Sequence, residues 1–344
     1  MKSIKKIRVA IVAPPFGSIG GPEVVAQNLT DALLKKGIDV TLFAPKDWKT
    51  KAKLIPTLEK SLWNIKNFSK QPVRVRNNMI ISSQVKILSY QKDFDIIHLH
   101  SQGYAYAVGI NLSVPSVLSL HSHIGLGEFQ QIKKTGVHIV SLSDSQQEKI
   151  KTEATIWNGV PVEKIKYSAK KGKYLIAIGR LTNQKGIDVA IQIAKKAGKK
   201  LLIFGRIGNS EERQEYFANK IKPFIDGKQI IYKGEVSHER IYDYLRNAEA
   251  LLFTIKGSEI CPMVVAESLA CGTPIIGTRI KPLLEILKDK KTAFLSDDIN
   301  KLVKCVKNIN NFDRQACRTY AEKYFDSSVM AEKYLELYYK ILKK

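Results

Sequence analysis

The chain alternates short, continuous apolar runs with amphipathic stretches, and this alternation limits the possible folds more than any other feature. A continuous apolar run is typical of a parallel strand buried on both faces. We expect one series of strands at 7–13, 40–43, 95–100, 115–120 and 138–142, and a second at 174–178, 200–204, 229–232, 250–253 and 274–276. We expect helices between them, including 22–36, 186–197, 210–222, 237–247 and 262–271.

Two such series predict an α/β protein with two Rossmann-like, doubly wound domains. The chain has 344 residues, a length that allows each domain its own core. We place the N-terminal domain at 1–165 and the C-terminal domain at 166–325. The last stretch, 297–343, contains a helical pattern and no strand. We expect a helix at 326–344 that packs back towards the first domain.

Composition indicates an ordinary globular protein of the cytoplasm. Hydrophobic residues make up 44% and charged residues 26% of the chain. The basic start, Met1 to Lys6, leads into a short strand-like run, which is not the pattern of a signal peptide. Four cysteines (Cys261, Cys271, Cys305 and Cys317) lack metal-type spacing, so we expect reduced thiols.

The net charge of +24 points to an anionic partner: nucleic acid, a membrane surface, or a phosphate-bearing substrate. Residues 46–76 hold nine Lys or Arg against Asp47 and Glu59. Trp48, Trp63 and Phe68 lie among these cations, and we expect them to insert at an anionic membrane surface. The alternative is an ordinary basic surface with two buried tryptophans. The first interpretation predicts a protein peripheral to the inner face of the cell membrane.

A glycine-containing loop, 14–23, joins the first strand to the first helix. Gly20 and Gly21 allow backbone to approach a ligand closely, and the following helix offers free N–H groups to a phosphate. The loop does not match G-x-G-x-x-G, which disfavours a standard dinucleotide site. The alternative is that the glycines simply make a turn.

A second loop, 179–186, follows a strand of the second series and carries two cations. Arg180 can bind a diphosphate through forked hydrogen bonds, and Lys185 can bind it as a point charge. The alternative is a pair of solvated surface cations. The flanking glycines and the loop position favour the ligand-binding interpretation.

Two carboxylates, Glu259 and Glu267, lie eight positions apart around a helix that starts near Pro262. Two acceptors at one site can bind two sets of sugar hydroxyls. The alternative is that Glu267 is an exposed helix residue. Its neighbours are apolar on nearly every side, and a carboxylate there is costly without a partner. We therefore favour a binding role.

Two histidine pairs, His98 with His100 and His121 with His123, follow i, i+2 spacing at strand ends. Alternation along a strand places the members of each pair on the same face. No carboxylate accompanies them at the usual ligand spacing, so we do not assign a metal site. We expect a single histidine of this group to line the cleft between the domains.

Together these motifs resemble the GT-B glycosyltransferases, specifically the retaining family 4. Gly20-Gly21 resembles the family's amino-terminal glycine loop, and Ser119-Leu-His121 its histidine strand end. The segment from Gly179 to Gly186 resembles its phosphate clamp. Glu259 to Glu267, followed by Ala-Cys-Gly-Thr-Pro, matches its E-x7-E signature. The order and spacing of these motifs extend across nearly the whole chain.

The resemblance implies a role for each matching residue. The implied catalytic residues are Arg180, Lys185, Glu259 and His121. The implied donor-binding residues are Gly20, Gly21, Gly205, Arg206, Lys233, Val236, Cys261, Pro262, Met263, Val264 and Glu267. The resemblance also implies retention, transfer without a metal ion, and a nucleotide-sugar donor, with UDP the first candidate and GDP the second. We expect a hexose-type sugar and a hydroxyl acceptor on a lipid-linked molecule, a glycan or the cell envelope.

Several departures and rival functions remain open at this point. Ile260-Cys261 replaces the usual glycine and aromatic pair, and 205–208 is a variant glycine turn. A nucleic acid or other polyanion as acceptor is permitted by the charge, but no recognition motif supports it. Two further functions stay open on the same fold: a non-catalytic protein that binds a sugar nucleotide, and an epimerase.

Overall fold

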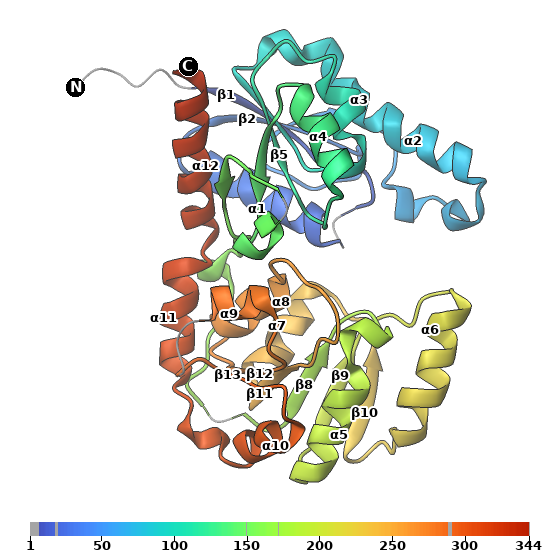
Figure 1. Ribbon diagram of the computed structural model, residues 1–344, viewed down its shortest axis with the longest axis vertical. Coiled ribbons are helices and arrows are strands. Elements are labelled where there is room, and N and C mark those ends of the chain that lie inside the picture. Colours follow the sequence, from blue (N-terminus) through green and yellow to red (C-terminus); the bar gives the residue numbers. More distant parts are fainter. Residues whose placement is uncertain (1–6, 18–19, 149, 171, 288–290, 344) are drawn as a thin grey trace. The chain divides into compact units, whose positions relative to one another are not determined.

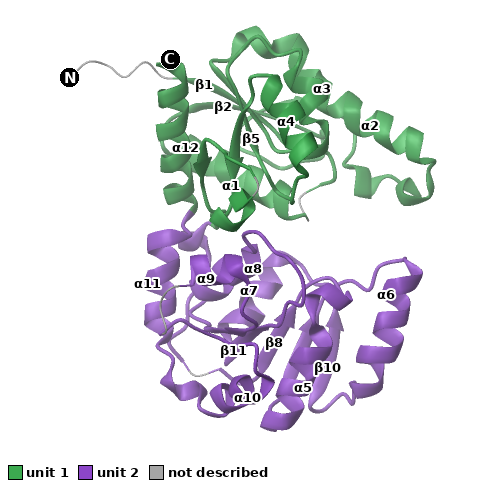
Figure 2. Ribbon diagram, in the orientation of Figure 1, with its two compact units in different colours: residues 1–160, 327–344 green, residues 161–326 purple. Residues whose placement is uncertain are grey.

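The computed structural model describes residues 7–17, 20–148, 150–170, 172–287 and 291–343. The chain divides into two compact units, 1–160 with 327–344, and 161–326 (Figures 1 and 2). Each unit is a parallel sheet with helices packed around it. The basic start, Met1 to Lys6, lies outside the described residues, as do Ser18 and Ile19 of the glycine loop.

Unit 1 contains a seven-stranded sheet in the order β3-β2-β1-β4-β5-β6-β7, and its described neighbouring strands pair in parallel. The strands are β1 (Arg8–Val12), β2 (Asp39–Ala44), β3 (Lys53–Pro56), β4 (Ile96–Leu99), β5 (Ser116–Ser119), β6 (His138–Ser141) and β7 (Ala154–Thr155). The α-helices are α1 (Gly21–Lys35), α2 (Val73–Val85), α3 (Ala105–Gly109), α4 (Leu126–Lys134) and α12 (Ser327–Leu342). The order of the strands reverses direction between β1 and β4, as in a doubly wound sheet.

Unit 2 contains a six-stranded sheet in the order β10-β9-β8-β11-β12-β13, again with parallel pairing. Its strands are β8 (Leu175–Ile178), β9 (Leu201–Phe204), β10 (Ile230–Gly234), β11 (Ala250–Phe253), β12 (Ile275–Gly277) and β13 (Ala293–Leu295). Its α-helices are α5 (Ile187–Ala197), α6 (Glu211–Tyr216), α7 (His238–Arg246), α8 (Met263–Ala270), α9 (Lys281–Ile286), α10 (Ile299–Lys307) and α11 (Arg314–Tyr324). The prediction of two Rossmann-like α/β folds is therefore confirmed.

All ten predicted strands are present, each within two residues of its expected bounds. The sequence missed β3, β7 and β13, and all three lie at sheet edges. They are two to four residues long, too short for an apolar pattern to stand out. The helix expected at 210–222 is also different: it is α-helical only to Tyr216 and continues as a π-helical turn, Phe217–Ile221.

The C-terminal helix α12 packs within unit 1, beside α1. Tyr334 and Tyr338 are fully buried there. At the start of α12 the backbone N–H of Ser327 donates to the carbonyl oxygen of Val160 at 2.9 Å. Lys36 Nζ contacts Glu332 Oε1 at 2.6 Å on the exposed side. The end of the chain is thus tied to the first sheet by buried rings and backbone bonds.

Two of the three aromatic residues expected to insert into a membrane are buried, so that part of the prediction was wrong. Trp48 is buried and its indole N–H donates to Gln27 Oε1 at 2.6 Å. Phe68 packs with Leu62 and Ile80 in a small apolar cluster. Trp63 remains 47% exposed at the rim of that cluster. Burying the apolar surface of a ring inside unit 1 is favourable, so the rings of Trp48 and Phe68 turn inwards.

Candidate functional site

Two loops at the carboxyl edge of the unit 2 sheet are joined by close backbone contacts. The first loop follows β8 and the second follows β11, its neighbour in the sheet. Thr254 Oγ1 donates to the carbonyl oxygen of Gly186 at 2.7 Å, and the N–H of Lys256 donates to the carbonyl oxygen of Gln184 at 2.8 Å. Lys256 Nζ also contacts Asp188 Oδ2 at 2.6 Å. The loops are therefore held as one structure.

This arrangement brings Lys185 and Glu259 into contact. The Lys185 ammonium donates to Glu259 Oε1, and both side chains are about one-sixth exposed. Arg180, on the same loop as Lys185, is exposed. The sequence predicted all three as catalytic residues, and the structure places them at one edge of the sheet. Partial burial makes the Lys–Glu attraction stronger than that of a fully solvated pair.

Glu267 lies inside α8 and is only 3% exposed. Its Oε1 atom lies 3.5 Å from His238 Nδ1, on the first residue of α7. The hydrogen bond with Glu267 is the main cause that raises the pKa of His238 above 6.5. Burial, and then Glu267, raise the pKa of Tyr242 well above 10. The buried carboxylate thus lies beside an imidazole on a neighbouring helix, and when that imidazole is protonated the pair offsets part of the cost of burial.

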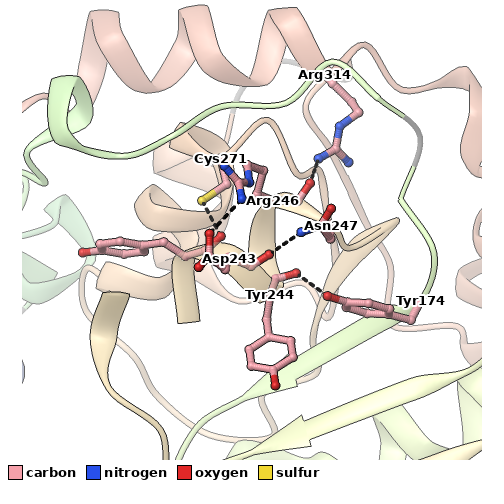
Figure 3. A network of polar contacts seen from close by, with 8 residues as sticks. Tyr174, Asp243, Tyr244, Arg246, Asn247, Cys271 and Arg314 are labelled. Atoms are coloured by element: carbon pink, nitrogen blue, oxygen red, sulfur yellow. Dashed lines mark hydrogen bonds and ion pairs between the residues drawn. The ribbon is translucent and has the colours of Figure 1, made fainter. Parts of the chain in front are cut away.

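Helix α7 is fixed at its C-terminal end, where the last four carbonyl groups lack partners within the helix. Figure 3 shows side chains that donate hydrogen bonds to these carbonyl oxygens. Asn247 Nδ2 donates to that of Asp243 at 2.8 Å, the Tyr174 hydroxyl to that of Tyr244 at 3.0 Å, and the Arg314 guanidinium to that of Arg246 at 2.7 Å. Thr273 Oγ1 donates to the carbonyl oxygen of Leu245 at 2.6 Å. These caps hold α7, and with it His238 at the opposite end.

The other predicted donor-binding residues of unit 2 lie at the carboxyl ends of β9 and β10 or in the segment after β11. Gly205 has φ +143, and a Cβ there would lie 1.8 Å from the carbonyl oxygen of Gly179, so the turn after β9 requires glycine. Arg206 Nε lies 3.6 Å from Glu235 Oε1, and both side chains are exposed. Lys233 is exposed and Val236 half-buried; Cys261 is buried, and Pro262, Met263 and Val264 are half-buried around the start of α8. Lys233 lies within β10, one residue before its end, and the others lie on loops at the carboxyl edge or on the first turn of α8.

The glycines predicted in unit 1 differ from each other in their surroundings. Gly20 precedes α1, and a Cβ on it would lie 2.0 Å from Glu23 Oε2, whereas a Cβ on Gly21 would have no atom within 4 Å. The Glu23 side chain therefore folds back over Gly20. It is 4% exposed, and burial raises its pKa to about 7. A carboxyl group thus occupies part of the helix N-terminus that the sequence assigned to a phosphate.

Three of the four histidines come together at the carboxyl ends of β4 and β5. The ring centroids of His98 and His100 are 4.3 Å apart, and those of His100 and His121 are 5.1 Å apart. His123 is exposed and does not join the stack. Among the described residues, no group of three or more His, Cys, Asp or Glu side chains is arranged to hold a metal ion.

The sequence did not single out His238, Glu23 or Thr254. His238 comes two residues after Val236, a predicted donor-binding residue, and its link to Glu267 depends on how α7 and α8 pack. Glu23 closes the predicted glycine loop, so its position was noticed but its burial was not. Thr254 directly follows β11, where a polar residue after an apolar run is the available signal.

Comparison with known proteins shows which family has these features. Residues 162–323 match the family model for glycosyl transferases group 1, and residues 19–163 match the model for glycosyltransferase family 4. The chain is a GT-B glycosyltransferase of this family. The two matches adjoin, and together they extend through both units.

One curated relative and two solved structures are similar to the chain over nearly its whole length. A Klebsiella pneumoniae protein of 41.2 kDa, described as uncharacterized and in the cps region, is 25% identical to this glycosyltransferase, covering 93% of this chain and 96% of that one. AviGT4, a glycosyltransferase involved in avilamycin A biosynthesis, has a similar structure with a TM-score of 0.71 and 20% identity over 98% of both chains. HepE from Anabaena, solved in complex with UDP and glucose, has a TM-score of 0.71 and 16% identity over 96% of this chain and 99% of its own.

The family assignment makes sugar transfer the activity of the chain. No helix among the described residues is long and apolar enough to cross a bilayer. In unit 2, the residues matching the family's phosphate clamp and its E-x7-E signature lie on loops and a helix at one sheet edge. In unit 1, the matching glycines and His121 likewise follow β1 and β5.

Proposed function

We propose that this glycosyltransferase moves a hexose-type sugar from a nucleoside diphosphate to a hydroxyl acceptor, with retention at the anomeric carbon and without a metal ion. UDP is the first candidate for the nucleotide, because the structurally similar HepE was solved with UDP and glucose. GDP is the second. The contact between Lys185 and Glu259 is the observation that carries the proposal.

That contact supports a site for a diphosphate. A phosphate oxygen competes with a carboxylate for the Lys185 ammonium, since both are anionic acceptors. When the donor binds, Lys185 passes from Glu259 to the phosphate, and the freed carboxylate accepts hydrogen bonds from the sugar hydroxyls. The exposed Arg180 contributes a second, forked donor to the diphosphate. Both cations then face the oxygens where negative charge grows as the sugar bond breaks.

The remaining site residues have supporting roles in this proposal. Glu267 accepts hydrogen bonds from the ribose hydroxyls, and the nearby backbone from Cys261 to Val264 lines the donor. Gly20 and Gly21 contact the phosphates, and His121 contacts the sugar. Gly205, Arg206, Lys233 and Val236 complete the donor site, the last two beside the base. Positive charges and helix N-termini take the place that a metal ion holds in other transferases.

For the acceptor we propose a lipid-linked molecule, a glycan or another part of the cell envelope, reached at an anionic membrane surface. The supporting observation is Trp63, an exposed ring within the basic segment 46–76. On α2, Val73 is 60% exposed, and Arg74 is exposed beside it. Exposed apolar side chains among cations suit an anionic interface. Nucleic acid remains the disfavoured acceptor.

The proposal is tested by incubating the full chain with a UDP- or GDP-sugar and a hydroxyl acceptor, and following the anomeric proton of the transferred sugar by NMR. With an accepted donor, the product should carry the same anomeric configuration as the donor. Inversion at the anomeric carbon would contradict retention. Release of an epimerised sugar nucleotide would instead favour an epimerase. Addition of EDTA should leave the rate unchanged, and a rate lost in EDTA and restored by Mg²⁺ would contradict metal independence.

A further inference from the structure

A buried chain of polar rings joins the C-terminal helix α12 to the end of β5 in unit 1. Tyr338 OH lies 2.6 Å from His98 Nδ1, and His98 Nε2 lies 2.8 Å from Ser119 Oγ. Ser119 Oγ in turn lies 2.5 Å from Tyr334 OH. All four side chains are fully buried. Both ring nitrogens of His98 are therefore occupied, and its ring is fixed.

His100 packs on this fixed ring and bonds to His121. The His98 and His100 rings lie 4.3 Å apart at 31°. His100 Nδ1 lies 2.9 Å from His121 Nε2, so one of these nitrogens donates and the other accepts. His100 is 1% exposed. Its other nitrogen, Nε2, is buried without a hydrogen-bond partner among the described residues.

Burial keeps these imidazoles neutral, so each carries one N–H. It lowers the pKa of His98 and of His121 to about 3. It also lowers the pKa of His100 well below 6.5, with His98 and His121 adding to the effect. In a neutral imidazole one nitrogen donates and the other accepts. The choice of tautomer for His100 therefore decides the direction of its bond to His121.

The hydrogen bond between His100 Nδ1 and His121 Nε2 can run in either direction, and the two directions leave a different group at the buried His100 Nε2. If His100 Nδ1 accepts, its proton is on Nε2 and a buried N–H has no acceptor. If His100 Nδ1 donates, only a lone pair is left without a donor. Unpaired buried N–H groups are rarer than under-used acceptors in native proteins. The second arrangement is thus the favoured one, and it makes His121 Nε2 an acceptor.

We infer that His100 is a positioning residue that holds His121 as the Nδ1–H tautomer. His121 then presents Nδ1–H as a donor to a substrate oxygen. This consequence rests on the proposed function, in which His121 contacts the donor sugar. The inference about the tautomer itself depends only on the described geometry of unit 1.

The test is a long-range ¹H–¹⁵N correlation spectrum of the histidine side chains in the full, substrate-free chain. Spectra of single His→Asn variants assign the six histidines. In the wild type, His121 should show a protonated Nδ1 and an unprotonated Nε2. A protonated Nε2 on His121 would overturn the inference, whatever substrate the enzyme uses.

Two variants at one position separate donation from packing. His100→Asn keeps an N–H donor close to the Nδ1 position, so the His121 tautomer should be retained. His100→Leu removes the donor, and His121 should shift to a mixture of tautomers. If His100→Leu leaves the His121 tautomer unchanged, His100 has no positioning role. A Leu variant that fails to fold leaves the wild-type spectrum and the Asn variant as the test.

The same spectra distinguish this inference from the proposed function. If wild-type His121 has the Nδ1–H tautomer but His121→Ala leaves kcat/KM unchanged with the donor found by the NMR assay, the contact with the sugar is wrong and the positioning stands. If the tautomer differs, the positioning is wrong even when His121→Ala is inactive.

Discussion

Thr254 Oγ1 donates to the carbonyl oxygen of Gly186 at 2.7 Å, and this bond joins the loop of Lys185 to the loop of Glu259. Gly186 has φ +61, and a Cβ there would lie 1.8 Å from the carbonyl oxygen of Thr254. The approach of two backbones is therefore what sets the distance between the cation and the carboxylate. A glycine at this position is required by conformation and by space.

We predict that Gly186→Ala lowers the free energy of unfolding by about 3 kcal/mol, the sum of a left-handed backbone and a steric clash. Gly198→Ala is the matched control, because Gly198 has φ +66 but no atom within 4 Å of a Cβ. The free energy of unfolding of Gly198→Ala should fall by about 1–2 kcal/mol. Urea denaturation of the two variants measures the difference. Equal losses would show that the close approach to Thr254 contributes nothing.

The strand positions were predictable because each buried parallel strand is a continuous apolar run, such as 250–253. Glu259 and Glu267 could be singled out as candidate site residues from the sequence, because their spacing is local and matches a family signature. The partner of Glu267 was not, since His238 reaches it only through the packing of α7 on α8. Likewise, the burial of Trp48 depends on Gln27, far away in sequence, and no local pattern reports such a contact.

Glu23 should make stability depend on pH. Burial raises its pKa from 4.5 to about 7, so the folded state keeps the proton to a higher pH than the unfolded state does. Stability from this group is complete below pH 4.5 and is lost as pH rises through about 7, by up to about 3 kcal/mol. Glu23→Gln removes this loss. Denaturation at pH 5 and pH 8 should show the variant gaining stability relative to wild type at pH 8; parallel profiles would contradict the burial of the carboxyl group.

His238 should also make stability depend on pH, but here the charged form of the side chain is the stabilising one. Its pKa is raised above 6.5 chiefly by the hydrogen bond with Glu267. The stability from this pair is fully present below pH 6.5 and is lost as pH rises through the raised pKa. The stability difference between wild type and His238→Asn should therefore shrink above pH 6.5. A difference that is constant from pH 6 to pH 9 would mean that the two groups do not interact.

Trp63 should contribute to membrane binding if the acceptor is reached at a bilayer. We predict that Trp63→Ala weakens binding to anionic vesicles at low salt by about tenfold, the effect of losing one partly inserted ring. Tyr106→Ala is the control, because Tyr106 is a 45% exposed aromatic residue of the same unit outside the basic segment. Vesicle flotation measures both. Equal losses of vesicle binding in the two variants, or wild-type protein that does not float with the vesicles, would contradict a membrane role for residues 46–76.

In the proposed function, the sheet edge of unit 2 binds a nucleoside diphosphate through Lys185. Isothermal titration of the full chain with UDP, and then with GDP, tests it most directly. Lys185→Met should weaken binding of the preferred nucleotide about tenfold or more, since one charge-assisted hydrogen bond is lost. Lys199→Met is the control: Lys199 pairs with Glu249 at 2.9 Å, at the amino ends of β9 and β11, and its loss should leave the Kd unchanged. Equal affinities for wild type and Lys185→Met, or no binding of either nucleotide, would contradict the account.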